Sequence, residues 1–273
     1  MHLYLSQITA FLNTPPLWKE PSLLGIRQFS LPEIYSNTID FPSEEVPEKQ
    51  QVLGKQMESI FEYIISHGQE YEILDKNVQI HENKITLGEI DFLLEEKKSG
   101  CFFHVEMAYK FYLFDPSLSG LEGWIGPNRR DSLLQKVQKF QNKQFPLLYH
   151  PLTENYLHSL GISSSQCEQK VCFKAWLFLP KNHMNYDFSD LNPDCIAGYW
   201  ISSAEFCEDE YRTRRYLCPP KKDWPLPPEK GENWLSFSEV WKQVQLLLQN
   251  KKSPLLWMKT EEFTYERIFV VFW

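Results

Sequence analysis

Apolar residues recur along this chain with two periods, and each period predicts a different kind of element. Over residues 52–65 they return every three or four positions, the spacing of a helix with one buried face, and Gly68 then marks its end. Three runs with the residue preferences of strands follow at 71–80, 84–94 and 101–113, the last two joined by the polar turn EEKKSG. This part of the chain therefore predicts a helix followed by three strands.

The two periods continue farther along the chain. The run RRDSLLQKVQKFQNKQ returns to helical spacing, and VCFKAWLFL reads as a further strand. The order of helix, three strands, helix and strand predicts an α/β fold with a mixed sheet flanked by helices. We divide the chain into a lead-in at 1–48 that packs on the core, a core at 49–180, and a C-terminal extension at 181–273 with a Pro-rich connector, a helix and a terminal strand.

Composition limits the compartment and the partners. The net charge of −8 argues against a general coat of positive charge for nucleic acid but leaves room for a local basic groove. The six cysteines show no C-x-x-C pair, and Cys101 and Cys172 fall in apolar strands where reduced, buried thiols are common. The amino terminus lacks a secretory pattern and no apolar run approaches 18 residues. We expect a cytoplasmic protein with no membrane partner.

Charged residues interrupt the second and third predicted strands at even spacing. Because alternate residues of a strand share a face, Asp91 points one way with its neighbour Glu89, and Glu106 shares a face with His104. A hairpin closed by EEKKSG sets Asp91 roughly opposite Glu106, with Cβ atoms about 5 Å apart. Two half-buried carboxylates at that spacing repel unless a proton or a cation neutralises them. A hard divalent cation with oxygen ligands is suited to that place.

Other side chains near this acid pair are candidates for supporting roles. Glu58 lies at the margin of the first helix's apolar stripe, from which it could supply a third metal ligand. Lys110 shares a strand face with Glu106 and could orient a water or offset phosphate charge. Glu89 and His104 are candidate supports for the ligands, with a surface acid and a structural histidine as the plainer interpretations.

Basic residues follow a glycine-rich loop and run into the second predicted helix. Arg129 and Arg130 come first, and Lys136, Lys139 and Lys143 then recur at three and four residues on one helical face. Such a face can hold a phosphate backbone, and an ordinary solvated helix surface is the alternative.

These motifs together resemble the PD-(D/E)XK nuclease superfamily, with GEIDFLL followed by HVEMAYK. From LGEIDFLLEE through KAWLFLP to LNPDCIAGYW the chain also resembles a bacterial family of unknown function grouped with that superfamily. The resemblance implies a restriction-endonuclease-like core, a Mg²⁺ or Mn²⁺ cofactor and nucleic acid as the partner. Residue by residue, it makes Asp91 and Glu106 metal-binding acids, Glu58 the acid of the first helix, and Lys110 the motif lysine. One departure is that Ala108 stands where the usual lysine would be.

The function predicted from these features is metal-dependent hydrolysis of phosphodiester bonds in DNA or RNA by a metal-activated water, with Asp91, Glu106 and Lys110 as the catalytic residues. One alternative is a nuclease-like fold without turnover that binds nucleic acid or a protein, which the displaced lysine and the acidic net charge favour. Another is a metal hydrolase of small molecules. The sequence leaves open the choice between DNA and RNA and the oligomeric state.

Overall fold

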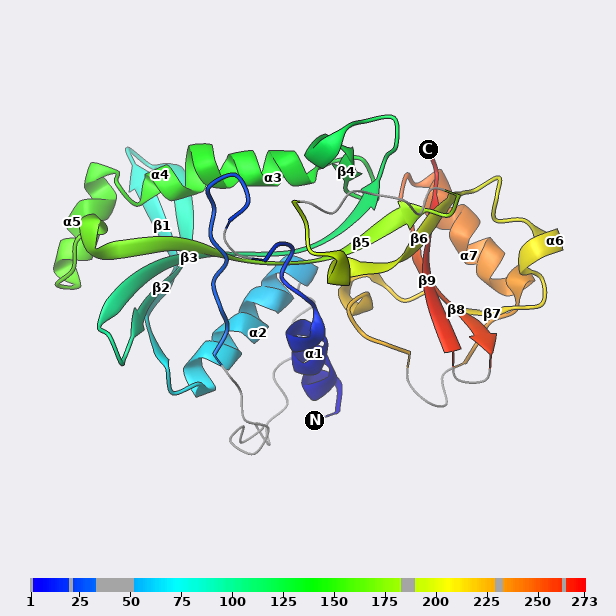
Figure 1. Cartoon of the computed structure of the whole chain (residues 1–273), viewed down its shortest axis with the longest axis horizontal. Coiled ribbons are helices and arrows are strands. Elements are labelled where there is room, and N and C mark those ends of the chain that lie inside the picture. The colour runs from blue at the N-terminus through cyan, green and yellow to red at the C-terminus, as the bar shows by residue number, and fades with distance from the viewer. Residues whose placement is uncertain (1, 20–21, 33–51, 183–189, 229–232, 262–263) are drawn as a thin grey trace.

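One mixed sheet runs the length of the molecule, and helices flank it (Figure 1). The computed structural model describes residues 2–19, 22–32, 52–182, 190–228, 233–261 and 264–273. These residues form nine strands in the order β1-β2-β3-β5-β6-β9-β8-β7, with β4 beside β3. The strands β3, β5, β6 and β9 run parallel to their neighbours in that series, while the pairs at either end are antiparallel. The predicted α/β class with a mixed sheet flanked by helices is confirmed.

The elements have the following bounds. The strands are β1 Tyr71–Glu82, β2 Ile85–Glu96, β3 Cys101–Phe114, β4 Trp124–Ile125, β5 Cys167–Pro180, β6 Ile196–Ser202, β7 Arg215–Leu217, β8 Leu255–Glu261 and β9 Thr264–Val271. The α-helices are α1 His2–Asn13, α2 Leu53–His67, α3 Leu133–Lys139, α4 Phe145–Leu147, α5 Pro151–Ser159, α6 Glu208–Tyr211 and α7 Phe237–Gln249. None of the helices among the described residues has the length and apolar character needed to cross a membrane.

Different helices cover the two faces of the first half of the sheet. In Figure 1, α1 and α2 lie on one side of β3, and α3 with α4 and α5 lies on the other. The side chains of β3 divide between these layers: Val105 and Met107 pack in a cluster with residues of α2, whereas Ala108 and Tyr112 pack with residues of α3. The alternation predicted for this strand is therefore confirmed, but helices enclose the face that also carries the charged residues.

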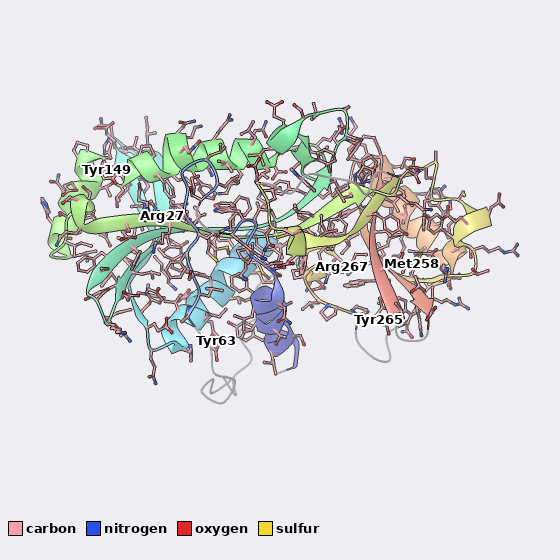
Figure 2. All side chains as sticks on the ribbon, viewed as in Figure 1. Arg27, Tyr63, Tyr149, Met258, Tyr265 and Arg267 are labelled. Atoms are coloured by element: carbon pink, nitrogen blue, oxygen red, sulfur yellow. The ribbon has the colours of Figure 1, made fainter. Side chains whose placement is uncertain are left out.

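The second half of the sheet comes from the C-terminal extension. Strands β6 to β9 continue the same sheet, and α7 packs on it through an apolar cluster that includes Val240, Ile268 and Met258. Figure 2 shows Met258 and Tyr265 among the side chains of β8 and β9 at this end of the molecule. The helix α7 begins after Ser236, its N-cap residue.

The structure also departs from the sequence expectations. The helix expected over the run RRDSLLQKVQKFQNKQ begins only at Leu133, and its α-helical part gives way to a π-helical turn at Phe140–Gln144. Cys101 is exposed rather than buried, because it opens β3 directly after the hairpin turn, whereas Cys172 is buried as expected. Part of the predicted lead-in, residues 33–48, lies outside the described residues.

Candidate functional site

The strands β2 and β3 part at the place where the acid pair lies. They are paired from the hairpin at Glu96 and Cys101 as far as Phe92 and Val105. One residue farther along this register stands Asp91, level with Glu106 as the sequence predicted. There the carboxylate Oδ2 of Asp91, rather than a backbone carbonyl, accepts the Met107 N–H at 2.9 Å. The ladder therefore ends at Asp91, and β3 continues with its side toward β2 unpaired by that strand.

Both acids of the pair are withdrawn from water. Glu106 has no exposed surface and Asp91 keeps 9% of its own. Burial, and then the charge of Glu106, raise the pKa of Asp91 well above its usual range. Burial also raises the pKa of Glu106, while the positive charge of Lys136 and a hydrogen bond from the Asp91 backbone oppose that change. The pair is therefore held where ionising both members costs free energy, and an added cation would lower that cost.

Hydrogen bonds fix the orientation of Glu106. His104, which is fully buried, contacts Glu106 Oε1 through Nε2 at 2.8 Å, and Gln144 donates to Oε2. Gln169 donates to His104 Nδ1 at 3.0 Å, so the ring proton lies on Nε2 and points at Glu106. Burial lowers the pKa of His104 to about 4, which keeps the ring neutral near pH 7. The predicted support by His104 thus has a geometric basis.

Lys136, rather than Lys110, is the cation that faces the acids. Burial, and then the charge of the neighbouring Lys139, lower the pKa of Lys136, while the charges of Glu106 and Asp91 oppose that change. Lys136 donates to Gln144 Oε1 at 3.2 Å and lies over the Phe140 ring at 4.1 Å. The sequence assigned Lys136 only to phosphate binding, whereas the structure brings its ammonium into the field of the acid pair.

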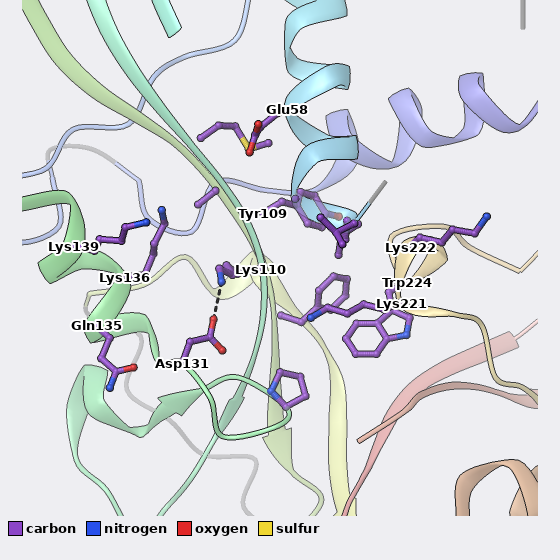
Figure 3. Close-up of a pocket in the computed structure, with 17 residues that line it drawn as sticks. Glu58, Tyr109, Lys110, Asp131, Gln135, Lys136, Lys139, Lys221, Lys222 and Trp224 are labelled. Atoms are coloured by element: carbon purple, nitrogen blue, oxygen red, sulfur yellow. Dashed lines mark hydrogen bonds and ion pairs between the residues drawn. The ribbon is translucent and has the colours of Figure 1, made fainter. Parts of the chain in front are cut away.

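A cavity of about 620 Å³ lies along β3 next to the pair: Met107 and Ala108, which follow Glu106, line it, whereas Asp91 and Glu106 do not. It is lined by five lysines but only two acids, Glu58 and Asp131. Its walls come from the start of α2, the middle of β3, helix α3 and the Pro-rich connector (Figure 3). The lysines are Lys110, Lys136, Lys139, Lys221 and Lys222. A chain with a net charge of −8 therefore gathers positive charge at this one place, as the sequence allowed.

Lys110 lines the cavity but is bound to an acid of its own. Its ammonium donates to Asp131 Oδ2 at 2.6 Å, the contact that Figure 3 marks with a dashed line. Asp131 lies against the backbone of Gly126, where an added Cβ would be only 2.1 Å from its carboxylate oxygen. Glycine is thus required at position 126 for Asp131 to reach Lys110.

Glu58 and Glu89 are joined by one lysine. Lys55 donates to Glu58 Oε2 at 2.6 Å and to Glu89 Oε1 at 3.2 Å. Glu58 also lines the cavity; burial raises its pKa, and the charge of Asp91 raises it further. The structure thus places Glu58 near Asp91 while Glu89 stays on the outer side of Lys55.

The predicted phosphate-binding residues divide between the cavity and its surroundings. Lys136 and Lys139 line it, but Arg129 does not: its guanidinium contacts Asp115 Oδ2 at 2.5 Å and lies over the Trp273 ring at 4.0 Å. Arg130 is exposed, and its charge acts on Lys221 at the cavity wall. Arg129 therefore ties the loop before α3 to the C-terminal end.

A pair of carboxylates is suited to an ion such as Mg²⁺, which keeps several water ligands, rather than to an ion that protein side chains enclose completely. No set of three or more His, Cys, Asp or Glu side chains within the described ranges is arranged to hold a metal ion. Magnesium is commonly held by one or two carboxylates, with waters and substrate phosphates as its other ligands. Each carboxylate oxygen has two acceptor positions, so the bonds from His104 and Gln144 leave Glu106 able to bind a cation.

Sequence reasoning missed several residues of the site. Gln144 reaches Glu106 from a π-helical turn, and no periodic pattern in the sequence reveals where such a turn will form. Gln169 lies on β5, level with His104 in the parallel pairing. Lys221 lies in the connector, which the sequence marked only as Pro-rich.

The fold and this site define an α/β protein in which a buried acid pair adjoins a lysine-lined cavity on a mixed sheet. A profile of a domain of unknown function, DUF1853, matches residues 32–271, and the chain belongs to that family. Neither the curated proteins nor the solved structures that were searched contain a match. The family match spans the acid pair, the cavity and the C-terminal strands.

Proposed function

We propose that this protein is a divalent-metal-dependent nuclease whose centre is Asp91 with Glu106. The observation that carries the proposal is that this buried carboxylate pair adjoins residues of a cavity lined by five lysines: Met107 and Lys136 line the cavity, Met107 donates to Asp91, and the charge of Lys136 acts on both acids. A cation suits the acids, and phosphate groups suit the lysines. A substrate that carries phosphates along its length can contact the lysines and can also supply oxygen ligands to a metal ion held by the acids.

Asp91 and Glu106 would hold Mg²⁺ or Mn²⁺. Glu58 lies near enough to Asp91 for the charge of Asp91 to raise the pKa of Glu58. When bound, such an ion polarises the scissile phosphate and acidifies a water. The rest of the work falls to the chain's own groups. The Met107 N–H fixes the Asp91 carboxylate, and His104 with Gln144 fixes that of Glu106.

Lysines supply the remaining charge stabilisation. Lys136 lines the cavity and its charge acts on both acids, so its ammonium can contact a phosphate oxygen as negative charge develops there. Lys110, the lysine expected from the sequence, is farther along β3 and paired with Asp131. We therefore assign the position nearest the reacting phosphate to Lys136 and a phosphate-holding role to Lys110.

The test begins with Mn²⁺ binding by calorimetry and then measures cleavage of single- and double-stranded DNA and RNA with Mn²⁺ or Mg²⁺. We expect wild-type protein to bind and cleave, and chelator to stop cleavage. Asp91→Asn and Glu106→Gln should each lower the cleavage rate by about 10³-fold or more while melting as folded proteins. The matched control is Glu82→Gln, an exposed acid at the end of β1. Absence of metal-dependent cleavage on every substrate contradicts the proposal.

The second candidate is a nucleic-acid-binding protein without turnover. The specific observation in its favour is that Glu106 is completely enclosed and already bonded to His104 and Gln144. In that case oligonucleotide binding falls with added salt, is unchanged by chelator, and is retained in Asp91→Asn without any cleavage by wild-type protein.

A further inference from the structure

The wall of the cavity opposite α3 comes from a segment far away in the sequence. Lys221 and Lys222 lie in a short 3-10 turn, η5 (Lys221–Asp223), of the connector that precedes α7. Figure 3 shows the Lys221 side chain directed toward Lys110, whereas Lys222 points away from it. Two adjacent lysines on the same turn thus both line the cavity, and Lys221 is the one directed toward β3.

Electrostatics distinguishes Lys221 in the same way. Desolvation, and then the positive charge of Lys110, lower the pKa of Lys221, and Arg130 lowers it further while Asp131 opposes them. Three cations thus share the field of a single carboxylate, Asp131. Like charges held together in this way raise the free energy of the empty site, and a bound anion relieves that repulsion.

This group of cations adjoins the one at the acid pair, since the charge of Lys110 also acts on Lys136, but it extends away from the acids along β3. Lys110 lies four residues beyond Glu106 on β3, about 13 Å along an extended strand. Lys136 and Lys139 rise from α3 on the other side of the cavity. A single phosphate at the acid pair therefore leaves Lys110 and Lys221 available for another one.

We propose that Lys110 and Lys221 form a second phosphate subsite, which binds a phosphate farther along the same nucleic-acid strand than the one beside Asp91 and Glu106. This inference rests on the proposed function for the role of the acid pair. It makes a polynucleotide strand, rather than a single nucleotide, the ligand of the cavity. It also gives the C-terminal extension a part in substrate binding.

The experiment measures binding of a fluorescently labelled single-stranded DNA 12-mer by anisotropy, in chelator, at several salt concentrations. Lys221→Ala is compared with Lys98→Ala, which removes the same charge from the exposed turn between β2 and β3, outside the cavity. We expect Lys221→Ala to weaken binding on the order of tenfold and to reduce the slope of log K against log salt by about 0.7, the loss of one phosphate contact. Lys98→Ala should leave both values close to those of wild type.

Equal effects of the two variants, or no effect of either, overturn the subsite. Thermal melts of both variants exclude unfolding as the cause of a loss, and Lys221→Gln repeats the test with a polar side chain. Displacement of the 12-mer by an equal concentration of adenosine diphosphate overturns the assignment to a strand, because a single nucleotide then suffices.

The outcome also separates this inference from the proposed function. If no metal supports cleavage but Lys221→Ala alone weakens binding, the subsite stands and the nuclease proposal fails. If wild type cleaves DNA and Lys221→Ala binds and cleaves equally well, the nuclease proposal stands and the subsite fails.

Discussion

The two halves of the sheet have interiors of different character. Between β6–β9 and α7 the buried cluster consists of apolar and aromatic side chains such as Val240, Val244 and Ile268. In the half formed by β1, β2, β3 and β5, the residues buried among the described ones include Asp91, His104, Glu106 and Lys174. The same sheet therefore has one half that is filled for stability and another that encloses ionisable groups.

That difference is the reason why we propose the functional site in the first half. Enclosing a carboxylate costs free energy unless hydrogen bonds and counter-charges compensate, and the Asp91 and Glu106 pair is only partly compensated. The apolar cluster of the C-terminal half encloses no such pair, and the one partly buried cation of β9, Arg267, lies instead over the Trp176 and Trp257 rings. Its contribution to the site is the connector, which brings Lys221 to the cavity wall.

The largest effect is expected from a cavity in the C-terminal half. Ile268 is fully buried between Leu256 of β8 and Tyr199 of β6, so Ile268→Ala should lower the free energy of unfolding by about 2–5 kcal/mol. Urea denaturation measures this loss. If the halves play separate roles, folded Ile268→Ala binds Mn²⁺ with wild-type affinity in calorimetry. A loss of Mn²⁺ binding in the folded variant would contradict separate roles for the two halves of the sheet.

Neutralising one acid in the first half is expected to raise the free energy of unfolding rather than lower it. Because the pKa of Asp91 is raised in the folded state, the folded protein retains protons that the unfolded chain releases. Stability therefore falls as the pH rises from about 4, the unfolded carboxyl pKa, through the raised folded value. Asp91→Asn removes this loss and should stabilise the protein by about 1–3 kcal/mol at pH 8, with little change at pH 4.

Denaturation at the two pH values checks this prediction, with Glu82→Gln as the control at an exposed acid. Millimolar Mn²⁺ at pH 8 should raise the melting temperature of wild type and leave that of Asp91→Asn unchanged, since ligand binding stabilises only the form that binds it. Destabilisation by Asp91→Asn at pH 8 would mean that its bond to Met107, rather than its charge, dominates the energetics.

The sequence was sufficient for the local parts of this site and insufficient for the distant ones. Alternation and the short turn set Asp91 level with Glu106, because both depend on residues close together in the chain. The partners Gln144 and Lys221 depend on a π-helical turn and on how the connector folds back. Periodicity carries no information on either. It also did not show that helices would enclose Glu106, since a polar face on a strand is typical of exposure to solvent.

The smallest effect is expected at the start of α7, where the C-terminal half has a polar feature at its surface. Ser236 donates through its N–H and its hydroxyl to Glu239 Oε2, at 2.7 and 2.6 Å. Ser236→Ala removes the hydroxyl of this cap and should cost about 1 kcal/mol. Because no buried charge is involved, the cost should be the same at pH 6 and pH 8, in contrast to Asp91→Asn. A cost that varied strongly between these pH values in urea denaturation would show that ionisable groups govern the C-terminal half as well.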